Sequence, residues 1–250
     1  MSSLGDFSHQ ASAYGPSRPG YPAEFISLLA ENAGVDAGDP VVDLGAGTGI
    51  STRLLVEAGF RVTAVEPNEA MREHADVPGA VWVDGSFEAT GLPDQSQAWA
   101  FAAQAFHWAY PPKALPEIRR ILRPQGKFTV LWNNRVAASG TTVGWTEQAI
   151  RRHVPDFNEA YRNRDWDQLL ESTGDFRFVA RNETKHAVLM SPDRYLQLWR
   201  SHNRLANVAG PERLEAFLTD LSDYLQREEI PQIEVVYKCE AWTAERVDKN

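Results

Sequence analysis

The chain has 250 residues, a formal net charge of −9 and one cysteine, Cys239. The length fits one large domain or one domain with an inserted cap, and the acidic balance argues against a large nucleic-acid surface, which needs clustered Lys and Arg. No apolar run approaches the roughly 18 residues of a membrane span, and the N-terminus lacks the basic-then-apolar order of a signal peptide. A lone cysteine excludes an internal disulfide framework and predicts a cytoplasmic protein.

The first half of the chain alternates between helical and strand-like patterns. After a polar arm, residues 23–33 carry apolar side chains at helical spacing. Strands are predicted at residues 41–45, 61–66, 80–83, 98–103 and 127–132. Helices are predicted at residues 49–58, 68–75 and 112–122, the last stopped by a turn at 123–126. Strands that alternate with helices predict a parallel sheet covered on both faces.

The helix that follows the first strand has a predicted start and a predicted buried face. Thr48 can cap its N-terminus, and Gly59 follows its end. The apolar residues at helical spacing, which we expect to face the core, are Ile50, Leu54, Leu55 and Ala58.

The pattern changes after about residue 135. Residues 141–172 are predicted to be mainly helical, 176–189 an edge strand and 233–242 a closing strand. Between these strands, two amphipathic helices are expected. The first would carry Tyr195, Leu198, Trp199, His202 and Leu205, and the second Leu214, Phe217, Leu218, Leu221 and Leu225. We therefore predict an α/β fold, a Rossmann-like and mainly parallel seven-stranded sheet with a helical cap; alternatively, these helices only bury a core face elsewhere.

The stretch "PVVDLGAGTGISTRLL", residues 40–55, contains a strand-to-helix turn with alternating glycines. Ligands of open α/β sheets bind at the carboxyl ends of the strands, where such a turn lies. A P-loop would need Lys after its last glycine, but Ile50 follows Gly49. A dinucleotide fold would need G-x-G-x-x-G, whereas Gly45, Gly47 and Gly49 place the third glycine one position early. Neither phosphate-binding pattern fits.

Two carboxylates indicate what this turn holds instead. Asp43 stands just before the turn, where it would repel a pyrophosphate but attract an ammonium or sulfonium group. Glu66, at the tip of the second predicted strand, can accept hydrogen bonds from both hydroxyls of a ribose. A ribose, a positive centre and no phosphate describe S-adenosylmethionine.

These residues resemble the class I S-adenosylmethionine-dependent methyltransferases. The likeness is carried by "VVDLGAGTGISTRLL" together with "VTAVEPNEAM". The runs "YGPSRPGYP" and "AQAFHW" are similar to the small-molecule branch that includes trans-aconitate methyltransferase and its relatives. The resemblance covers roughly residues 5–135.

The resemblance implies a cofactor site. Asp43 would support the turn, its three glycines would lie against the methionine part and the ribose, and Glu66 would hold the ribose. The resemblance also implies three groups of residues around the cofactor. Pro67, Asn68 and Met71 would lie beside the adenine, and Gly85, Ser86 and Phe87 on its other side. Ala103 and Gln104 would lie beside the methionine part. Tyr14 and Arg18 would belong to an arm that folds over the cofactor. For Met71 and Phe87, core packing is the alternative.

Acceptor-side residues are expected where strand ends face the site. His107 is either a general base or a positioning residue, since its imidazole titrates near neutral pH. Trp132 and Asn133, at the end of the fifth predicted strand, are further candidates because strand ends face the site. The remaining candidates, each of which can instead be a packing residue, are Tyr21, Phe106, Trp108, Trp199 and His202. The histidines show no metal-ligand spacing, so no metal is expected.

The expected function is methyl transfer from S-adenosylmethionine, with S-adenosylhomocysteine as product, to a carboxylate, hydroxyl or amine of a small molecule by in-line displacement. The alternatives are a methyltransferase for a macromolecule such as tRNA or protein, and a non-catalytic binder of the cofactor or its product. The expected parts are residues 1–35 as an arm and helix over the cofactor, 36–135 as the cofactor-binding core, and 136–243 as the rest of the sheet with a substrate cap. No nucleic-acid or membrane partner is expected, and the chain would be a monomer or homodimer.

Overall fold

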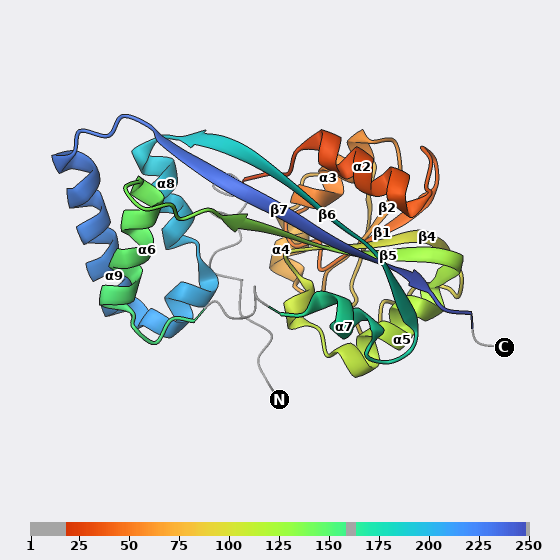
Figure 1. The fold of residues 1–250 in the computed structure, drawn as a ribbon. Helices are drawn as coiled ribbons and strands as arrows, with labels where there is room; N and C mark the ends of the chain where they lie inside the picture. The colour runs from red at the N-terminus through yellow and green to blue at the C-terminus, as the bar shows by residue number, and fades with distance from the viewer. Residues whose placement is uncertain (1–18, 159–163, 249–250) are drawn as a thin grey trace. The chain divides into compact units, whose positions relative to one another are not determined.

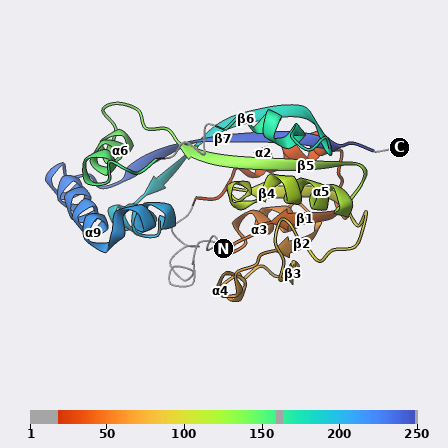
Figure 2. The same ribbon diagram turned by 90° about the horizontal axis from the view of Figure 1, so that it is seen from below.

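The computed structural model describes residues 19–158 and 164–248, and its centre is a seven-stranded sheet with the order β3-β2-β1-β4-β5-β7-β6 (Figure 1). Figure 2 shows the same order, with β5, β7 and β6 on the other side of β4 from β1 and β2. In chain order the strands are β1 Pro40–Leu44, β2 Arg61–Val65, β3 Val81–Val83, β4 Gln97–Ala103, β5 Leu122–Arg135, β6 Phe176–Met190 and β7 Ile233–Arg246.

The first five strands of the chain are parallel to one another. On β1, Val42 is paired with Thr63 of β2 on one side and with Ala100 of β4 on the other. β3 extends this parallel ladder beyond β2, and β5 extends it beyond β4. Their carboxyl ends therefore meet at one edge of the sheet.

Strand β7 pairs with β5 in the antiparallel direction. The Cys239 thiol donates to Asn133 Oδ1 at 3.1 Å, and the hydroxyls of Thr129 and Thr243 lie 2.9 Å apart. The residue number rises along β7 as it falls along β5, which defines an antiparallel pair. β6 lies at the edge of the sheet, as predicted. The mainly parallel, Rossmann-like α/β fold class is confirmed.

Helices cover both faces of this sheet. Val41 packs in one buried cluster with α2 (Ala23–Ala33) and α3 (Ile50–Glu57). Its neighbour Val42 packs in another, with α5 (Pro111–Ile121) and α7 (Trp166–Glu171). The alternation follows from the period of two along a strand. Because β1 is central, its side chains are buried on both sides, which explains its continuous apolar run.

The start of α3 differs from the prediction. Its N-cap is Gly49, with a φ of 86° and no side-chain cap, so the assignment of Thr48 is wrong. Of the predicted apolar set, Leu55 is buried and Leu54 and Ala58 are partly buried against the same cluster. The other two buried residues of this helix, Ser51 and Thr52, were not predicted. The two hydroxyls can be buried because both donate to the same carboxylate, described below.

The turn predicted at residues 123–126 lies inside β5. Leu122 is paired with Gln97 of β4, but Lys127 is already paired with Trp99, so the intervening residues bulge out of the ladder. Gln125 within this bulge has a φ of 61°. Two short helices follow strands of the parallel ladder: α4 (Glu69–Glu73) comes after β2, and the 3-10 helix η1 (Phe106–Trp108) comes after β4.

The chain forms two compact units. The core unit consists of Gly20–Asn133, Tyr161–Thr184 and Cys239–Asn250. The helical unit includes Asn134–Ala160 and Lys185–Lys238. In the described part of the chain, its helices are α6 (Thr142–His153), α8 (Pro192–Arg200) and α9 (Asn203–Arg227). The helical unit has its own buried cluster, to which all three helices contribute. The predicted three-part division and the role of these helices as a cap stay predictions.

The helical unit corrects the prediction that Trp199 and His202 share one helix. α8 ends at Arg200, and His202 is the N-cap of α9, where its Nδ1 accepts a hydrogen bond from Leu205 N–H at 3.2 Å. The φ and ψ of His202, −80° and 87°, are not helical. α9 is itself kinked at Gly210, which has a φ of 69° and precedes Pro211. No helix among the described residues is long and apolar enough to cross a membrane.

The packing in the centre of the sheet can be tested at a buried hydroxyl group, that of Thr129. Thr129 Oγ1 accepts from Trp99 Nε1 at 2.9 Å and pairs with the Thr243 hydroxyl. Thr129→Val keeps the shape but leaves these polar groups without that partner, so the free energy of unfolding should fall by about 1–3 kcal/mol. Urea denaturation measures this loss. Thr129→Ser, which keeps the hydroxyl, should cost only about 1 kcal/mol; equal losses in the two variants would contradict the assignment.

Candidate functional site

Most of the predicted site residues lie in the core unit, at or just beyond the carboxyl ends of β1 to β5. Trp199 and His202 belong to the helical unit instead. Tyr14 and Arg18 lie outside the described residues. Tyr21 is partly buried against the cluster that contains α2.

Asp43, on β1, fastens the glycine turn to the helix that follows it. Its side chain is completely buried, and Oδ2 accepts hydrogen bonds from Ser51 Oγ at 2.8 Å and Thr52 Oγ1 at 2.7 Å. Burial and, to a smaller extent, the nearby charge of Glu66 raise the pKa of this carboxyl to about 6, and the two hydroxyl bonds oppose the rise. Asp43 is therefore ionised at neutral pH and places a negative charge beneath the turn.

The three glycines of the turn have different surroundings. All three have positive φ, between 58° and 86°, which favours glycine. A Cβ at Gly45 would lie 2.7 Å from Ala105 Cβ, and one at Gly49 would lie 2.6 Å from Val77 Cγ2. A Cβ at Gly47 would meet nothing within 4 Å. Gly45 and Gly49 thus allow close packing inside the protein, whereas Gly47 borders open space.

Glu66 joins the ends of β1 and β2. Its Oε2 accepts a hydrogen bond from Gly47 N–H and its Oε1 one from Asn68 N–H, both at 2.9 Å. Burial raises the pKa of this carboxyl, and the two backbone bonds oppose the rise. Arg72 stays close, since its Nη1 donates to the Glu66 carbonyl at 2.6 Å. Each carboxylate oxygen can accept a second hydrogen bond, so both can also bind hydroxyl groups of a ligand.

The predicted adenine-flanking residues follow β2 and β3. Pro67 is exposed, and Asn68 caps α4 by accepting from Met71 N–H at 3.1 Å. Met71 is 3% exposed, as a packing residue would be. Arg72 of α4 also pairs with Asp84, just after β3, at 3.3 Å.

The group after β3 forms a tight turn. Ser86 and Ala89 bond to each other through their backbones, and Ser86 Oγ accepts from Glu88 N–H at 3.2 Å. A Cβ at Gly85 would lie 2.8 Å from the Thr90 carbonyl oxygen, so glycine is needed there for close approach. Phe87 is nearly buried against the ring of Phe106, with ring centroids 5.5 Å apart.

Gln104, which follows Ala103 at the end of β4, has an unusual backbone. Its φ is 56°, a region that residues other than glycine rarely adopt. The conformation is held by two hydrogen bonds to β5: Gln104 N–H donates to the Leu131 carbonyl at 2.8 Å, and Nε2 donates to the Asn133 carbonyl at 3.0 Å. Such strain occurs preferentially at functional sites.

Asn133 connects three distant segments of the chain. Its Nδ2 donates to the carbonyl of Gly20, where the N-terminal segment enters the described structure, at 3.2 Å. Its Oδ1 accepts from the Cys239 thiol. Burial raises the pKa of that thiol to about 12, so it stays protonated and remains a donor. No pattern in the sequence predicted this pairing.

The aromatic run after β4 is divided between the core and the surface. Phe106 is completely buried, with its ring centroid 5.1 Å from that of Phe128, as expected of a packing residue, the alternative given for it above. Trp132 is likewise buried, at 1% exposed, and its ring stacks on that of Trp166 with the centroids 4.8 Å apart. His107 is half-buried, with its ring 5.3 Å from that of Trp132, and Trp108 is 40% exposed. His107 and Trp108 remain the residues of this run that a ligand can reach.

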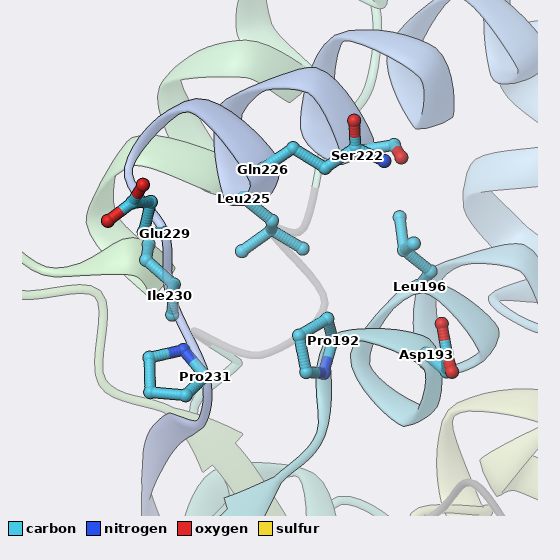
Figure 3. Close-up of a pocket in the computed structure, with 9 residues that line it drawn as sticks. All are labelled: Pro192, Asp193, Leu196, Ser222, Leu225, Gln226, Glu229, Ile230 and Pro231. Atoms are coloured by element: carbon cyan, nitrogen blue, oxygen red, sulfur yellow. The ribbon is translucent and has the colours of Figure 1, made fainter.

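A surface pocket elsewhere does not contain these residues. It has a volume of about 340 Å³ and lies in the helical unit, between α8, α9 and the turn before β7 (Figure 3). Apolar side chains of Leu196, Leu225 and Ile230 line it together with the carboxylates of Asp193 and Glu229. No predicted site residue lines it. Within the described residues, no group of His, Cys, Asp and Glu side chains is arranged to hold a metal ion.

The strand-end residues fit a cationic nucleoside. Gly47 leaves room above the turn, Glu66 provides acceptors beside it, and Asp43 contributes negative charge beneath it. Ser51 and Thr52, which sequence reasoning missed, keep that charge in place; the signal was a pair of hydroxyl residues in the first turn of the helix. These features define a nucleoside site of the S-adenosylmethionine type on a mainly parallel sheet.

Comparisons with known proteins agree with this class. Residues 42–130 match a family model described as a methyltransferase domain. An uncharacterized methyltransferase of Mycobacterium tuberculosis is 34% identical over 224 residues, which cover 82% of this chain and 89% of that protein. A solved structure from Anaeromyxobacter dehalogenans, provisionally named a type II methyltransferase, has a TM-score of 0.66 at 22% identity and covers 92% of this chain and 97% of that one.

A second solved structure, from Anabaena variabilis, has a TM-score of 0.59 at 20% identity and covers 93% of this chain and 98% of that one. It is provisionally named a methyltransferase from an antibiotic biosynthesis pathway. The chain belongs to the family of methyltransferase-domain proteins. It is an S-adenosylmethionine-dependent methyltransferase, and S-adenosylmethionine is its cofactor.

The pKa of Asp43 predicts how stability depends on pH. Between about pH 4 and pH 6 the folded state binds more protons at Asp43 than the unfolded state does, so the free energy of unfolding should fall as the pH rises through this range. Asp43→Asn cannot titrate and should lose this part of the slope. Urea denaturation at several pH values measures it. Asp36→Asn, at an exposed position, is the control, and an unchanged slope in Asp43→Asn would refute the assignment.

Proposed function

We propose that this methyltransferase acts on a small molecule and that the acceptor atom belongs to a carboxylate, hydroxyl or amine. The observation that supports the methyl-transfer part of this proposal is the open space over Gly47 beside the Glu66 carboxylate, where we place the nucleoside donor. The net charge of −9 disfavours a polyanionic substrate such as tRNA. The antibiotic-pathway name of the Anabaena relative also favours a small acceptor.

Each group of residues has a proposed role in this reaction. Glu66 would hold the ribose hydroxyls, and the Ser86 turn would lie along the adenine. Gln104, fixed in its strained conformation, would hold the methionine part. Bound S-adenosylmethionine supplies a methyl group activated by a positively charged sulfur. Because the methyl group is already activated, the protein acts mainly by alignment, which can supply roughly 7–11 kcal/mol in the best cases.

His107 and Trp108 would face the acceptor. We propose that the half-buried imidazole of His107 positions the acceptor, and that it takes a proton only where the acceptor is a hydroxyl or an amine. A carboxylate acceptor is already ionised and needs no base. We further propose a small-molecule branch similar to trans-aconitate methyltransferase, a cytoplasmic location and a monomer or homodimer.

Turnover tests the proposal directly. The purified chain is incubated with S-adenosylmethionine and a panel of small carboxylic acids, including trans-aconitate, together with phenols and amines, and S-adenosylhomocysteine is quantified. We expect release with at least one small acceptor and none with total tRNA or denatured protein. Release with tRNA or protein alone would make the macromolecular alternative correct.

Glu66→Ala tests the ribose contact. Loss of its charge-assisted hydrogen bonds should weaken S-adenosylhomocysteine binding by about 1–3 kcal/mol in titration calorimetry. Glu73→Ala, at an exposed position on the neighbouring helix, should bind as tightly as the wild type. Thermal denaturation must show that both variants fold. Equal affinities for the two variants would mean that Glu66 does not contact the ribose.

His107→Gln separates positioning from proton transfer. If His107 positions the acceptor, the KM for the acceptor should rise while the pH profile of kcat keeps its shape. A general base would instead cost about 10²–10⁴-fold in kcat and remove the acidic limb of the profile. His74→Gln, on the exposed end of α4, is the matched control and should leave both quantities unchanged.

A further inference from the structure

The pocket of the helical unit has apolar walls (Figure 3). α8 contributes Pro192 and Leu196, α9 contributes Leu225, and Ile230 lies in the turn that follows. All of the lining residues belong to the segment Lys185–Lys238, so the pocket lies within one compact unit. Its volume of about 340 Å³ falls within the range of roughly 300–1,000 Å³ that is typical of pockets for small organic ligands. The walls can therefore cover the apolar part of such a ligand.

The charged groups that line this pocket are both negative. They are the carboxylates of Asp193 and Glu229, and the other described residues of the lining are uncharged. Neither carboxylate has a hydrogen-bond or ion-pair partner within the described part of the chain. In the view of Figure 3 the two residues lie on opposite sides of the Leu225 side chain. A ligand in the pocket would thus contact apolar walls flanked by two free carboxylates.

Glu229 occupies a backbone position, just after α9, that glycine normally takes. Its N–H donates to the Gln226 carbonyl at 3.1 Å. Ile230 N–H donates to the Leu225 carbonyl, also at 3.1 Å. These two bonds define a Schellman motif, in which the residue at the position of Glu229 is left-handed and is usually glycine. The φ of Glu229 is 49°, so a side chain at this position lowers the stability of the turn.

The charge of Glu229 is also unfavourable at this position. The last carbonyls of a helix form the negative end of its dipole, which repels a carboxylate at the C-terminus. Glu228, the preceding residue, pairs with Arg227 at 3.0 Å, whereas the Glu229 carboxylate has no partner in the described chain. A residue that is disfavoured by both its backbone and its charge indicates a role other than stability, since such strain concentrates at functional sites. A bound cation would supply the missing partner.

We propose that this pocket binds an organic ammonium ion. The apolar part of the ligand would lie against Leu196, Leu225 and Ile230, and the carboxylates of Asp193 and Glu229 would attract its positive charge. The negative end of α9 adds to this attraction. The site is separate from the proposed function, because none of the residues assigned to methyl transfer lines the pocket.

Amines and their neutral isosteres test the pocket. 2-Phenylethylamine and n-hexylamine are compared with 2-phenylethanol and n-hexanol by saturation-transfer NMR titration of the full chain at low ionic strength. At least one amine should bind about threefold or more tightly than its alcohol, the effect expected of exposed charge pairs. High salt should remove this amine preference, because it screens exposed charges.

A double variant removes both charges and keeps the shape of the side chains. Asp193→Asn/Glu229→Gln should bind the amine no more tightly than the alcohol, while its alcohol affinity stays within about twofold of the wild type. Both positions are exposed, so the substitutions leave the buried core intact. Asp223→Asn is the matched control, because Asp223 is an exposed residue of α9 that does not line the pocket. It should keep the amine preference.

Glu229→Gly separates ligand binding from stability. Glycine suits the left-handed backbone and removes the charge at the helix end, so the melting temperature should rise by about 2–4 °C while the amine preference falls. Glu228→Gly is the control: Glu228 has a φ of −86°, and its replacement should not raise the melting temperature. A lower melting temperature of Glu229→Gly with an unchanged amine preference would show that Glu229 serves only the turn, and it would overturn the proposal.

Three other results would also overturn the proposal. The first is that the wild type binds no amine, or binds amines and alcohols equally. The second is an amine preference that survives in the double variant, which would place the amine elsewhere on the chain. The third is amine binding that appears only when the protein is diluted, which would mean that a second copy of the chain occupies the pocket.

Discussion

The hydrogen bond from Gly47 N–H to the Glu66 carboxylate is the contact on which the site depends. It joins the turn after β1 to the tip of β2, one step beyond the backbone hydrogen bonds that Gly45 and Ala46 donate to the Val65 carbonyl. The carboxylate is nearly buried and also accepts from Asn68, so its position is fixed before any ligand arrives. Such preorganisation reduces the entropy cost of binding, because the hydrogen-bond acceptors for a ribose are already held in place.

Below this hydrogen bond, the fold contains a buried negative charge whose desolvation lowers the stability of the protein. Asp43 is completely buried, and desolvation outweighs the two hydroxyl groups that stabilise its ionised form. A carboxylate kept at such a cost suits a site for a positively charged ligand, since the charge acts across a short, poorly solvated distance. The same reasoning explains why the first turn of α3 contains Ser51 and Thr52 on its buried side where an amphipathic helix would have apolar residues.

The acceptor side is arranged around the long strand β5 and its partner β7. Asn133 makes hydrogen bonds to three other parts of the chain. Its Nδ2 donates to the Gly20 carbonyl, its own carbonyl accepts from Gln104 Nε2, and its Oδ1 accepts from the Cys239 thiol. Cys239 contributes here as a protonated donor, since burial raises its pKa. Two residues further along β5, Arg135 belongs to the helical unit, where its guanidinium carbon lies 4.2 Å from the centroid of the Trp199 ring.

The sequence by itself determined the sheet, its helices and the cofactor class, because these depend on local patterns: strand-helix alternation, the spacing of the turn glycines, and one carboxylate at each of two strand tips. Only the tertiary structure decided that Phe106 and Trp132 are buried, that His202 caps a separate helix, and that Cys239 donates a hydrogen bond to Asn133. Those facts depend on contacts between residues far apart in the chain, where burial and partner geometry, not spacing, set what a side chain can do.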